Sequence, residues 1–340
     1  MLLNAYVTHR DPPPIDFPHT LRGRRDRSDR ELVAHLRGFM GFVTQRGKRP
    51  MNATRYAVIR HLERVRHHVA LEIDVPALPA FARWASAANS LVFTEDARVT
   101  APDGATLVDP ETGDAAPGAV LPYPVDSVGR KAATDAKLTP LGIQPPGSLP
   151  PVVSEIEVEL RTPADVARRS LALFACALRA ESISTGNEIP VADLRARLPL
   201  AVAAMTDAER AFFDASPPER QTVVNHLWRY ESLAVLAWAL ELTPQLPFPN
   251  AITDVPALAK VMFAQNTPSF GVTARLRPTA EILDALDLHF RLHWATTDAR
   301  VKRSAPPGSL EASVVLERHY ALNWLTRFED APWDDVTTPT

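Results

Sequence analysis

In the first hundred residues the apolar positions repeat either at helical spacing or at the two-residue spacing of a strand. Apolar positions at helical spacing predict helices at 29–42, 56–65 and 78–88, the first with Ser28 as its N-cap. Short strands are predicted at 2–8, 68–74 and 91–94. The second of these alternates Val69, Leu71 and Ile73 with polar residues, as a half-buried strand does. The region 1–100 is therefore predicted to be a small α/β layer domain.

From residue 155 onward the helical period dominates. Thr162 and Pro163 supply a cap and a first-turn proline for a helix that runs to about Ser182. Capping boxes at Thr206 and Ser216 predict helices at about 207–214 and 217–242. Further helices are predicted at 254–263, 278–301 and 310–328. The region 155–340 is therefore predicted to be an all-α multi-helix domain.

Proline and glycine separate these two regions. Residues 101–151 contain ten Pro and six Gly, and proline disfavours helix both at its own position and in the residue before it. The segment 101–154 is therefore predicted to be an extended or turned linker or strap, anchored by scattered apolar residues. Together the three parts predict an α+β fold class.

Composition limits the kinds of protein this can be. The chain has 340 residues, of which 46% are hydrophobic and 23% charged, as in an ordinary globular protein. The lone Cys176 excludes an intramolecular disulfide scaffold. Apolar runs such as 233–240 are shorter than a membrane helix, and 1–8 does not resemble a signal peptide. A soluble, cytoplasmic protein without a membrane partner is expected.

Positive charge is concentrated near the start of the chain. Residues 1–70 hold 14 Lys or Arg against 6 Asp or Glu, most densely from Arg22 to Arg27. Such a run can attract phosphates. It has no interleaved aromatic residues and matches no nucleic-acid-binding module, so a solvated surface is favoured over a nucleic-acid partner.

Four sequence pieces in the helical region resemble a known family. They are Leu227-Trp228-Arg229-Tyr230-Glu231-Ser232-Leu233 continuing into 236–240, Leu292-His293-Trp294-Ala295, the stretch from Glu317 to Leu325, and Trp333-Asp334-Asp335-Val336. In this order they resemble the bacterial domain of unknown function 4272 over about residues 160–338. The resemblance implies a helical fold and assigns no activity, so it supplies no catalytic residues.

Charged residues interrupt the apolar faces of two of the predicted helices. Glu231 and Glu317 lie on apolar stripes, as do Arg229 and Arg318, whereas His319 and Asn323 are four residues apart and share a face. Because an isolated buried charge is costly, these groups need partners or a water-filled cleft. One interpretation is a structural network in which Arg229 or Arg318 bridges Glu231 or Glu317, and His319 and Asn323 complete the hydrogen bonds. A second is a polar pocket in which a Glu acts as general base and an Arg binds an anion. A third is an arrangement in which these groups are mostly exposed.

Metal and cofactor sites have weaker support. His289 and His293 are spaced as H-x3-H, and Glu317 or His319 could add a further ligand, but H-E-x-x-H is absent. The P-loop, the G-x-G-x-x-G turn and the G-x-S-x-G elbow are absent as well. No metal or cofactor is therefore expected. The helical tryptophans are expected to bury their rings in one core: Trp228, Trp238, Trp294 and Trp324.

The sequence thus favours a non-catalytic binding or interaction protein whose partner is an unidentified protein or small molecule. The alternative is a hydrolase or metal-assisted enzyme with its site between the helices around 217–242, 278–301 and 310–328. Near the end of the chain, Pro332 is predicted to stop the preceding helix, so that Trp333 packs on the helices and Asp334 or Asp335 meets Arg229 or Arg318.

Overall fold

The structure of the protein is a computed structural model that describes all residues except 46 and 47. The chain divides into two compact units. Unit 1 comprises Met1–Ala132 and Pro146–Val158, and unit 2 comprises Ala133–Pro145 and Glu159–Thr340. The division falls inside helix α4 (Val125–Leu138). Each unit has its own buried apolar core, and each is described by itself.

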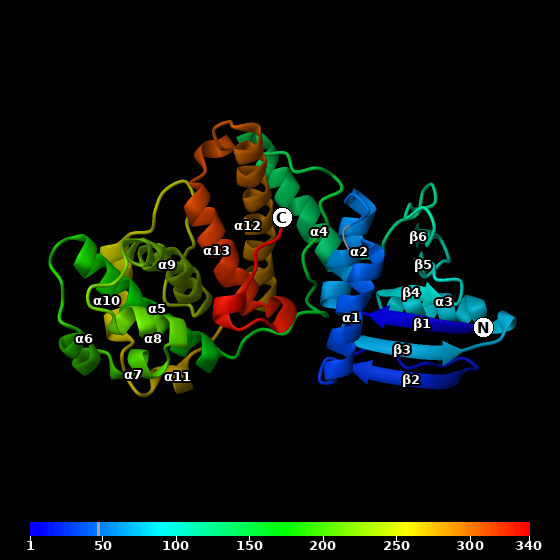
Figure 1. Cartoon of the computed structure of the whole chain (residues 1–340), viewed down its shortest axis with the longest axis horizontal. Helices are drawn as coiled ribbons and strands as arrows, with labels where there is room; N and C mark the ends of the chain where they lie inside the picture. Colours follow the sequence, from blue (N-terminus) through cyan, green and yellow to red (C-terminus); the bar gives the residue numbers. More distant parts are fainter. Residues whose placement is uncertain (46–47) are drawn as a thin grey trace. The chain divides into compact units, whose positions relative to one another are not determined.

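Unit 1 is built on a six-stranded antiparallel sheet with the strand order β2-β3-β1-β4-β5-β6. Its strands are β1 (Leu2–Val7), β2 (Thr20–Asp26), β3 (His67–Glu72), β4 (Ser90–Thr94), β5 (Val99–Thr100) and β6 (Thr106–Val108). Strand β1 lies in the middle, where Ala5 is opposite Val69 on one side and Val92 on the other (Figure 1).

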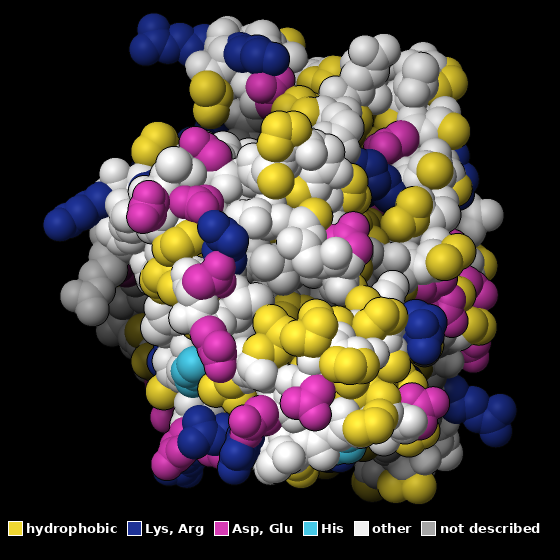
Figure 2. Space-filling view, turned by 90° about the vertical axis from the view of Figure 1, so that its right-hand side faces the viewer, with side chains coloured by type: hydrophobic (Ala, Val, Ile, Leu, Met, Phe, Trp, Pro, Cys, Tyr) yellow, Lys and Arg dark blue, Asp and Glu magenta, His cyan; other side chains and the backbone are white. Residues whose placement is uncertain are grey.

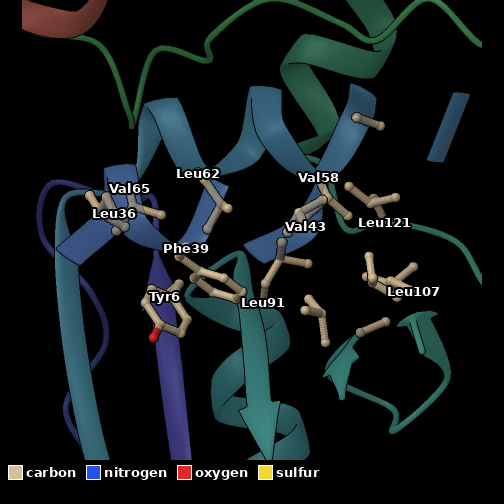
Figure 3. Close-up of a cluster of buried hydrophobic side chains, with 14 of the residues drawn as sticks. Tyr6, Leu36, Phe39, Val43, Val58, Leu62, Val65, Leu91, Leu107 and Leu121 are labelled. Carbon is tan, nitrogen blue, oxygen red and sulfur yellow. The ribbon is translucent and has the colours of Figure 1, made fainter. Parts of the chain in front are cut away.

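Helices cover both faces of this sheet. Alternation along β1 sends Tyr6 to one face and Val7 to the other. Helices α1 (Arg30–Val43) and α2 (Ala53–Arg64) cover the Tyr6 face, where Phe39 and Leu62 meet it (Figure 3). Helix α3 (Leu78–Ala87) covers the opposite face with Phe81 and Trp84. Unit 1 is therefore a three-layer arrangement with two apolar cores.

Residues 22–26 of the basic run lie in the edge strand β2, which the sequence did not predict, and Arg27 follows it. Most residues of this strand are exposed, so it lacks the apolar alternation that signals a strand; backbone pairing with β3 holds it in place. Its arginines meet acids, for example Arg22 with Glu72. On the face of the molecule shown in Figure 2, Lys and Arg are likewise interspersed with Asp and Glu. The predicted N-cap Ser28 is also wrong, because the Asp29 side chain caps α1 instead.

The prediction that 101–154 is an extended or turned linker is wrong in part, because this segment contains the 14-residue helix α4. Its prolines are unevenly placed. Pro124 immediately precedes α4 and Pro140 closely follows it, while the helix itself contains none. Proline outside a helix limits its ends without breaking it. The high proline content of the whole segment therefore hid a stretch without proline, residues 125–138, that forms a helix.

Unit 2 consists of helices. They are α5 (Pro163–Ser184), α6 (Val191–Arg197), α7 (Pro199–Ala203), α8 (Asp207–Asp214), α9 (Arg220–Ala239), α10 (Val255–Ala264), α11 (Phe270–Thr273), α12 (Thr279–Lys302) and α13 (Ala312–Leu325). Short 3-10 turns of this unit occur at Thr139–Leu141, Pro307–Ser309, Phe328–Asp330 and Trp333–Asp335, and one at Val75–Ala77 lies in unit 1. Helix α9 packs against α5 and α13, and α13 also packs against α12 (Figure 1). All strands of the described residues lie in unit 1, so the predicted α+β fold class is confirmed.

Capping signals placed the starts of α5 and α8 correctly, whereas α6, α7 and α11 were not predicted. The side chain of Thr162 accepts a hydrogen bond from the N–H of Asp165, and Thr206 forms the predicted capping box with Glu209. The capping box predicted at Ser216 is wrong: α9 begins at Arg220, with Glu219 in extended geometry before it. Two consecutive prolines follow Ser216, and a residue that precedes proline is driven out of helical geometry. None of the described helices combines the length and apolar character needed to cross a lipid bilayer.

Candidate functional site

Glu231 and Arg318 form a buried ion pair between α9 and α13. Arg318 donates from Nε and Nη2 to Oε2 of Glu231 at 3.0 and 2.9 Å. The other carboxylate oxygen, Oε1, accepts a hydrogen bond from the backbone N–H of Thr253 at 2.6 Å. Arg318 also donates from Nη1 to the carbonyl of Pro247 at 2.5 Å. Both oxygens of Glu231 are thus engaged, and the pair ties the segment between α9 and α10 to two helices.

Arg229 and Glu317 form a second ion pair between the same helices. Nη1 of Arg229 donates to Oε2 of Glu317 at 3.0 Å, and the hydroxyl of Ser232 donates to the same oxygen at 2.8 Å. The guanidinium group of Arg229 also lies over the ring of Tyr320, with Cζ 4.8 Å from the ring centroid. The carboxylate and the ring hold Arg229 from two directions.

The candidate histidines lie on α12 and α13. The Nδ1 atoms of His293 and His319 are 2.9 Å apart, which requires one ring to donate and the other to accept. Nδ1 of His289 donates to the carbonyl of Ala285 on its own helix at 2.8 Å. Burial lowers the pKa of His289 and that of His293 to about 4, which favours the neutral rings. Within the described residues, no group of three or more His, Cys, Asp or Glu is placed to hold a metal ion.

Trp333 docks on the helices, as the sequence predicted, and is only 4% exposed. Its ring meets those of Tyr320 and Trp324 nearly edge-on, with centroid distances of 5.0 and 5.4 Å. The guanidinium groups of Arg169 and Arg229 also lie over it, with Cζ at 5.3 and 5.6 Å from the ring. The hydroxyl of Tyr320 donates to the carbonyl of Trp333. The end of the chain is therefore part of the helical core.

The prediction that Asp334 or Asp335 meets Arg229 or Arg318 is wrong. Asp334 and Asp335 are exposed, whereas Arg229 pairs with Glu317 and Arg318 pairs with Glu231. The glutamates lie on facing turns of the packed helices, so they meet the arginines first. Asn323 anchors the terminal segment instead, with Nδ2 donating to the carbonyl of Thr337 at 2.8 Å.

A pocket of about 310 Å³ borders α9. Its wall contains Leu227 and Trp228 from α9 and Val255 from the start of α10. Tyr230 supplies a hydroxyl that donates to Oε2 of Glu181 on α5 at 2.6 Å. Burial, and then Glu181, raise the pKa of Tyr230 above its usual range, so the phenol stays protonated and remains a donor.

The prediction that four helical tryptophans bury their rings in one core is wrong for two of them. Trp238 and Trp324 are buried, with 8% and 6% of their surfaces exposed. Trp228 and Trp294 are only half-buried, and Trp228 lines the pocket. The position of a tryptophan on an apolar helix thus predicted burial correctly for Trp238 and Trp324. Nothing in the sequence indicated a cavity beside α9.

Residues 130–336 match the family model described as a domain of unknown function (DUF4272). The matched region is more than half of the chain. The chain belongs to this family. No curated protein and no solved structure matched the chain. The DUF4272 match begins within α4 and includes both ion pairs, the candidate histidines and the pocket beside α9. The predicted resemblance is confirmed.

The sequence analysis missed further buried charges within the DUF4272 region, among them an ion pair on α12 and Glu157. Arg291 and Asp287 on α12 pair through two hydrogen bonds of 2.9 Å, and both side chains are fully buried. Their spacing of four residues was the available signal. Glu157 in unit 1 is also fully buried and accepts from Arg64 and Asn89, each at 3.1 Å. Burial alone would raise the pKa of Glu157, but Arg64 and the hydrogen bonds bring it below its ordinary value. No local pattern marks Glu157, since these partners are distant in the sequence.

Proposed function

We propose that this DUF4272 protein is a non-catalytic binding protein, and that the pocket beside α9 binds a small, largely apolar molecule. The main support is the different environment of neighbouring positions on α9. Glu231 borders the pocket but is only 2% exposed and has both carboxylate oxygens engaged, whereas Leu227 and Trp228 are half-buried and line the open space. The volume of about 310 Å³ lies at the lower end of the range of known small-molecule pockets.

The alternative is a hydrolase or metal-assisted enzyme acting between α9, α12 and α13. A general base needs a lone pair that reaches a proton of the substrate. Glu231 directs its oxygens to Arg318 and the N–H of Thr253, and Glu317 directs one oxygen to Arg229 and Ser232. Separating a buried carboxylate from its partners costs several kcal/mol. These contacts favour a role in holding the helices together.

Isothermal titration calorimetry of the full chain with 1-octanol, a neutral apolar probe, tests the proposal. We expect saturable binding. Leu227→Trp adds volume inside the pocket and should weaken binding at least about tenfold, a change of about 1.4 kcal/mol. Leu316→Trp is the matched control, because Leu316 is 42% exposed on α13 and does not line the pocket. No saturable heat with the wild type, or equal binding by both variants, would contradict the proposal.

The proposal includes a bacterial, cytoplasmic location. It is supported by the family resemblance and by the single cysteine, Cys176, which is buried and unpaired. Cell fractionation with an antibody against the natural protein tests it, and recovery from an extracytoplasmic fraction would contradict it.

A further inference from the structure

We infer that the pocket beside α9 selects an amphiphilic organic cation, namely a primary ammonium group carried by an apolar chain. The inference rests on the proposed function, because it names the ligand class of the same pocket. It depends on three features of the lining: its apolar wall, the carboxylate of Glu181, and the neutralisation of the other charges around it.

The apolar wall accounts for the chain of the ligand. Leu227, Trp228 and Val255 line the cavity, and Val224 and Ile252 lie at exposed positions of the same lining. Val224 and Ile252 are 37% and 65% exposed, so a bound alkyl chain would cover apolar surface that now faces water.

Glu181 accounts for the positive charge of the ligand. Its Oε2 accepts the hydrogen bond from Tyr230, which fixes the orientation of the carboxylate. In the part of the chain that the structure describes, Oε1 of Glu181 has no donor and is available to an ammonium group. Glu181 also lies in the last turn of α5, where the carbonyl end of the helix adds partial negative charge. The ring of Trp228 in the same lining offers a cation–π surface.

The remaining charges of the lining do not favour an anion. Glu231 borders the pocket but is neutralised by Arg318. The lining contains no Lys, Arg or His among the described residues. The N-terminus of α10, which could attract an anion, is already capped by the side chain of Asp254, which accepts from the N–H of Ala257. The unbalanced charge of the pocket is therefore that of Glu181.

Calorimetric titration with three eight-carbon probes tests the ligand class: n-octylamine in its protonated form, 1-octanol and octanoate. The apolar chain is the same, so differences in Kd report the head group. We expect the amine to bind about tenfold more tightly than the alcohol, and octanoate to bind most weakly. Equal binding of amine and alcohol, or tighter binding of octanoate, would overturn the ligand class and leave the proposed function standing. Failure of all three to bind would overturn both.

A matched pair of variants assigns the selectivity to Glu181. Glu181→Gln should weaken amine binding about tenfold and leave 1-octanol binding unchanged, and the retained octanol binding shows that the pocket is intact. Glu311→Gln removes the same charge at an exposed position outside the lining and should change neither. Unchanged amine binding by Glu181→Gln would overturn the inference.

A measurement on the wild type decides the matter if Glu181→Gln does not fold. Raising the ionic strength should weaken binding of the amine relative to that of the alcohol, because salt screens the attraction between opposite charges. A ratio of the two Kd values that is independent of salt would overturn the inference.

Discussion

Arg318 and Glu231 are 87 residues apart in the sequence, yet two nitrogens of the arginine converge on one oxygen of the glutamate. The side chains are 1% and 3% exposed. In the folded protein neither side chain is open to water, so each charge depends on its partner. The pair joins α9 to α13, and the bond from Glu231 to the N–H of Thr253 adds the segment before α10.

Breaking this pair from one side should be costly. Arg318→Met leaves the carboxylate of Glu231 buried without its counter-ion, and we expect the free energy of unfolding to fall by roughly 3–5 kcal/mol. The double variant Glu231→Gln/Arg318→Met removes both charges and keeps an acceptor for the N–H of Thr253, so it should lose less. Urea denaturation measures both. A loss below about 1 kcal/mol for Arg318→Met would show that the pair is solvated.

Docking of Trp333 should contribute to the stability of unit 2. Trp333→Ala removes a buried ring that contacts Tyr320, Trp324 and two guanidinium groups, and should cost roughly 3–5 kcal/mol. Asp335→Ala, two residues away and exposed, should leave the midpoint nearly unchanged. Thermal unfolding followed by circular dichroism compares them. Equal midpoints would mean that the terminal segment is not docked in solution.

The free energy of unfolding should depend on pH through the buried His289. Its pKa is about 4 in the folded protein, against about 6.5 in an unfolded chain, so the unfolded state binds the proton more readily between these values. The contribution is therefore complete above about pH 6.5 and is lost as the pH falls toward 4, by up to about 3 kcal/mol. Urea denaturation at pH 7 and pH 4.5 measures the loss.

Two substitutions on α12 separate this titration from general destabilisation. His289→Leu should be less sensitive to acid than the wild type, since the titrating ring is gone. Phe290→Leu changes a buried neighbour without a titrating group and should keep the acid sensitivity of the wild type. Equal losses between pH 7 and pH 4.5 in both variants would argue against His289 as a source of the effect.

The purified, untagged protein should contain no stoichiometric transition metal. His293 contacts His319, and His289 donates to its own helix, so the H-x3-H pair does not converge on a common point. Elemental analysis by mass spectrometry checks this. Zinc near one equivalent that disappears in His293→Ala would refute the prediction and support the enzyme alternative.

The domain boundaries at 100 and 154 remain a prediction. If two separately packed parts meet around 101–154, limited proteolysis should begin in the mostly exposed residues 111–120, between β6 and α4. Proteinase K followed by intact-mass measurement should then yield a stable C-terminal fragment. Early cleavage within α9 while 111–120 stays intact would indicate a single fused core instead.

The sequence alone determined the features that depend on near neighbours. These features involve residues within one or two helical turns of each other. They are the cap at Thr162, the capping box of Thr206 with Glu209, and the helical period through α9, α12 and α13. They were predictable because these interactions are complete within a few consecutive residues. Where the local signal was averaged over a longer stretch, as for α4, or was absent, as in the exposed strand β2, the prediction was wrong.

Only the tertiary structure decided which distant groups meet. The sequence showed that Arg229 and Arg318 needed acids, but the packing of α9 on α13 selected Glu317 for the first and Glu231 for the second. The sequence did not locate the largely apolar pocket beside α9, because a cavity is space that side chains of separate segments fail to fill. Glu181, Trp228 and Val255 line it together only because α5, α9 and α10 converge there, and no spacing along the chain encodes that convergence.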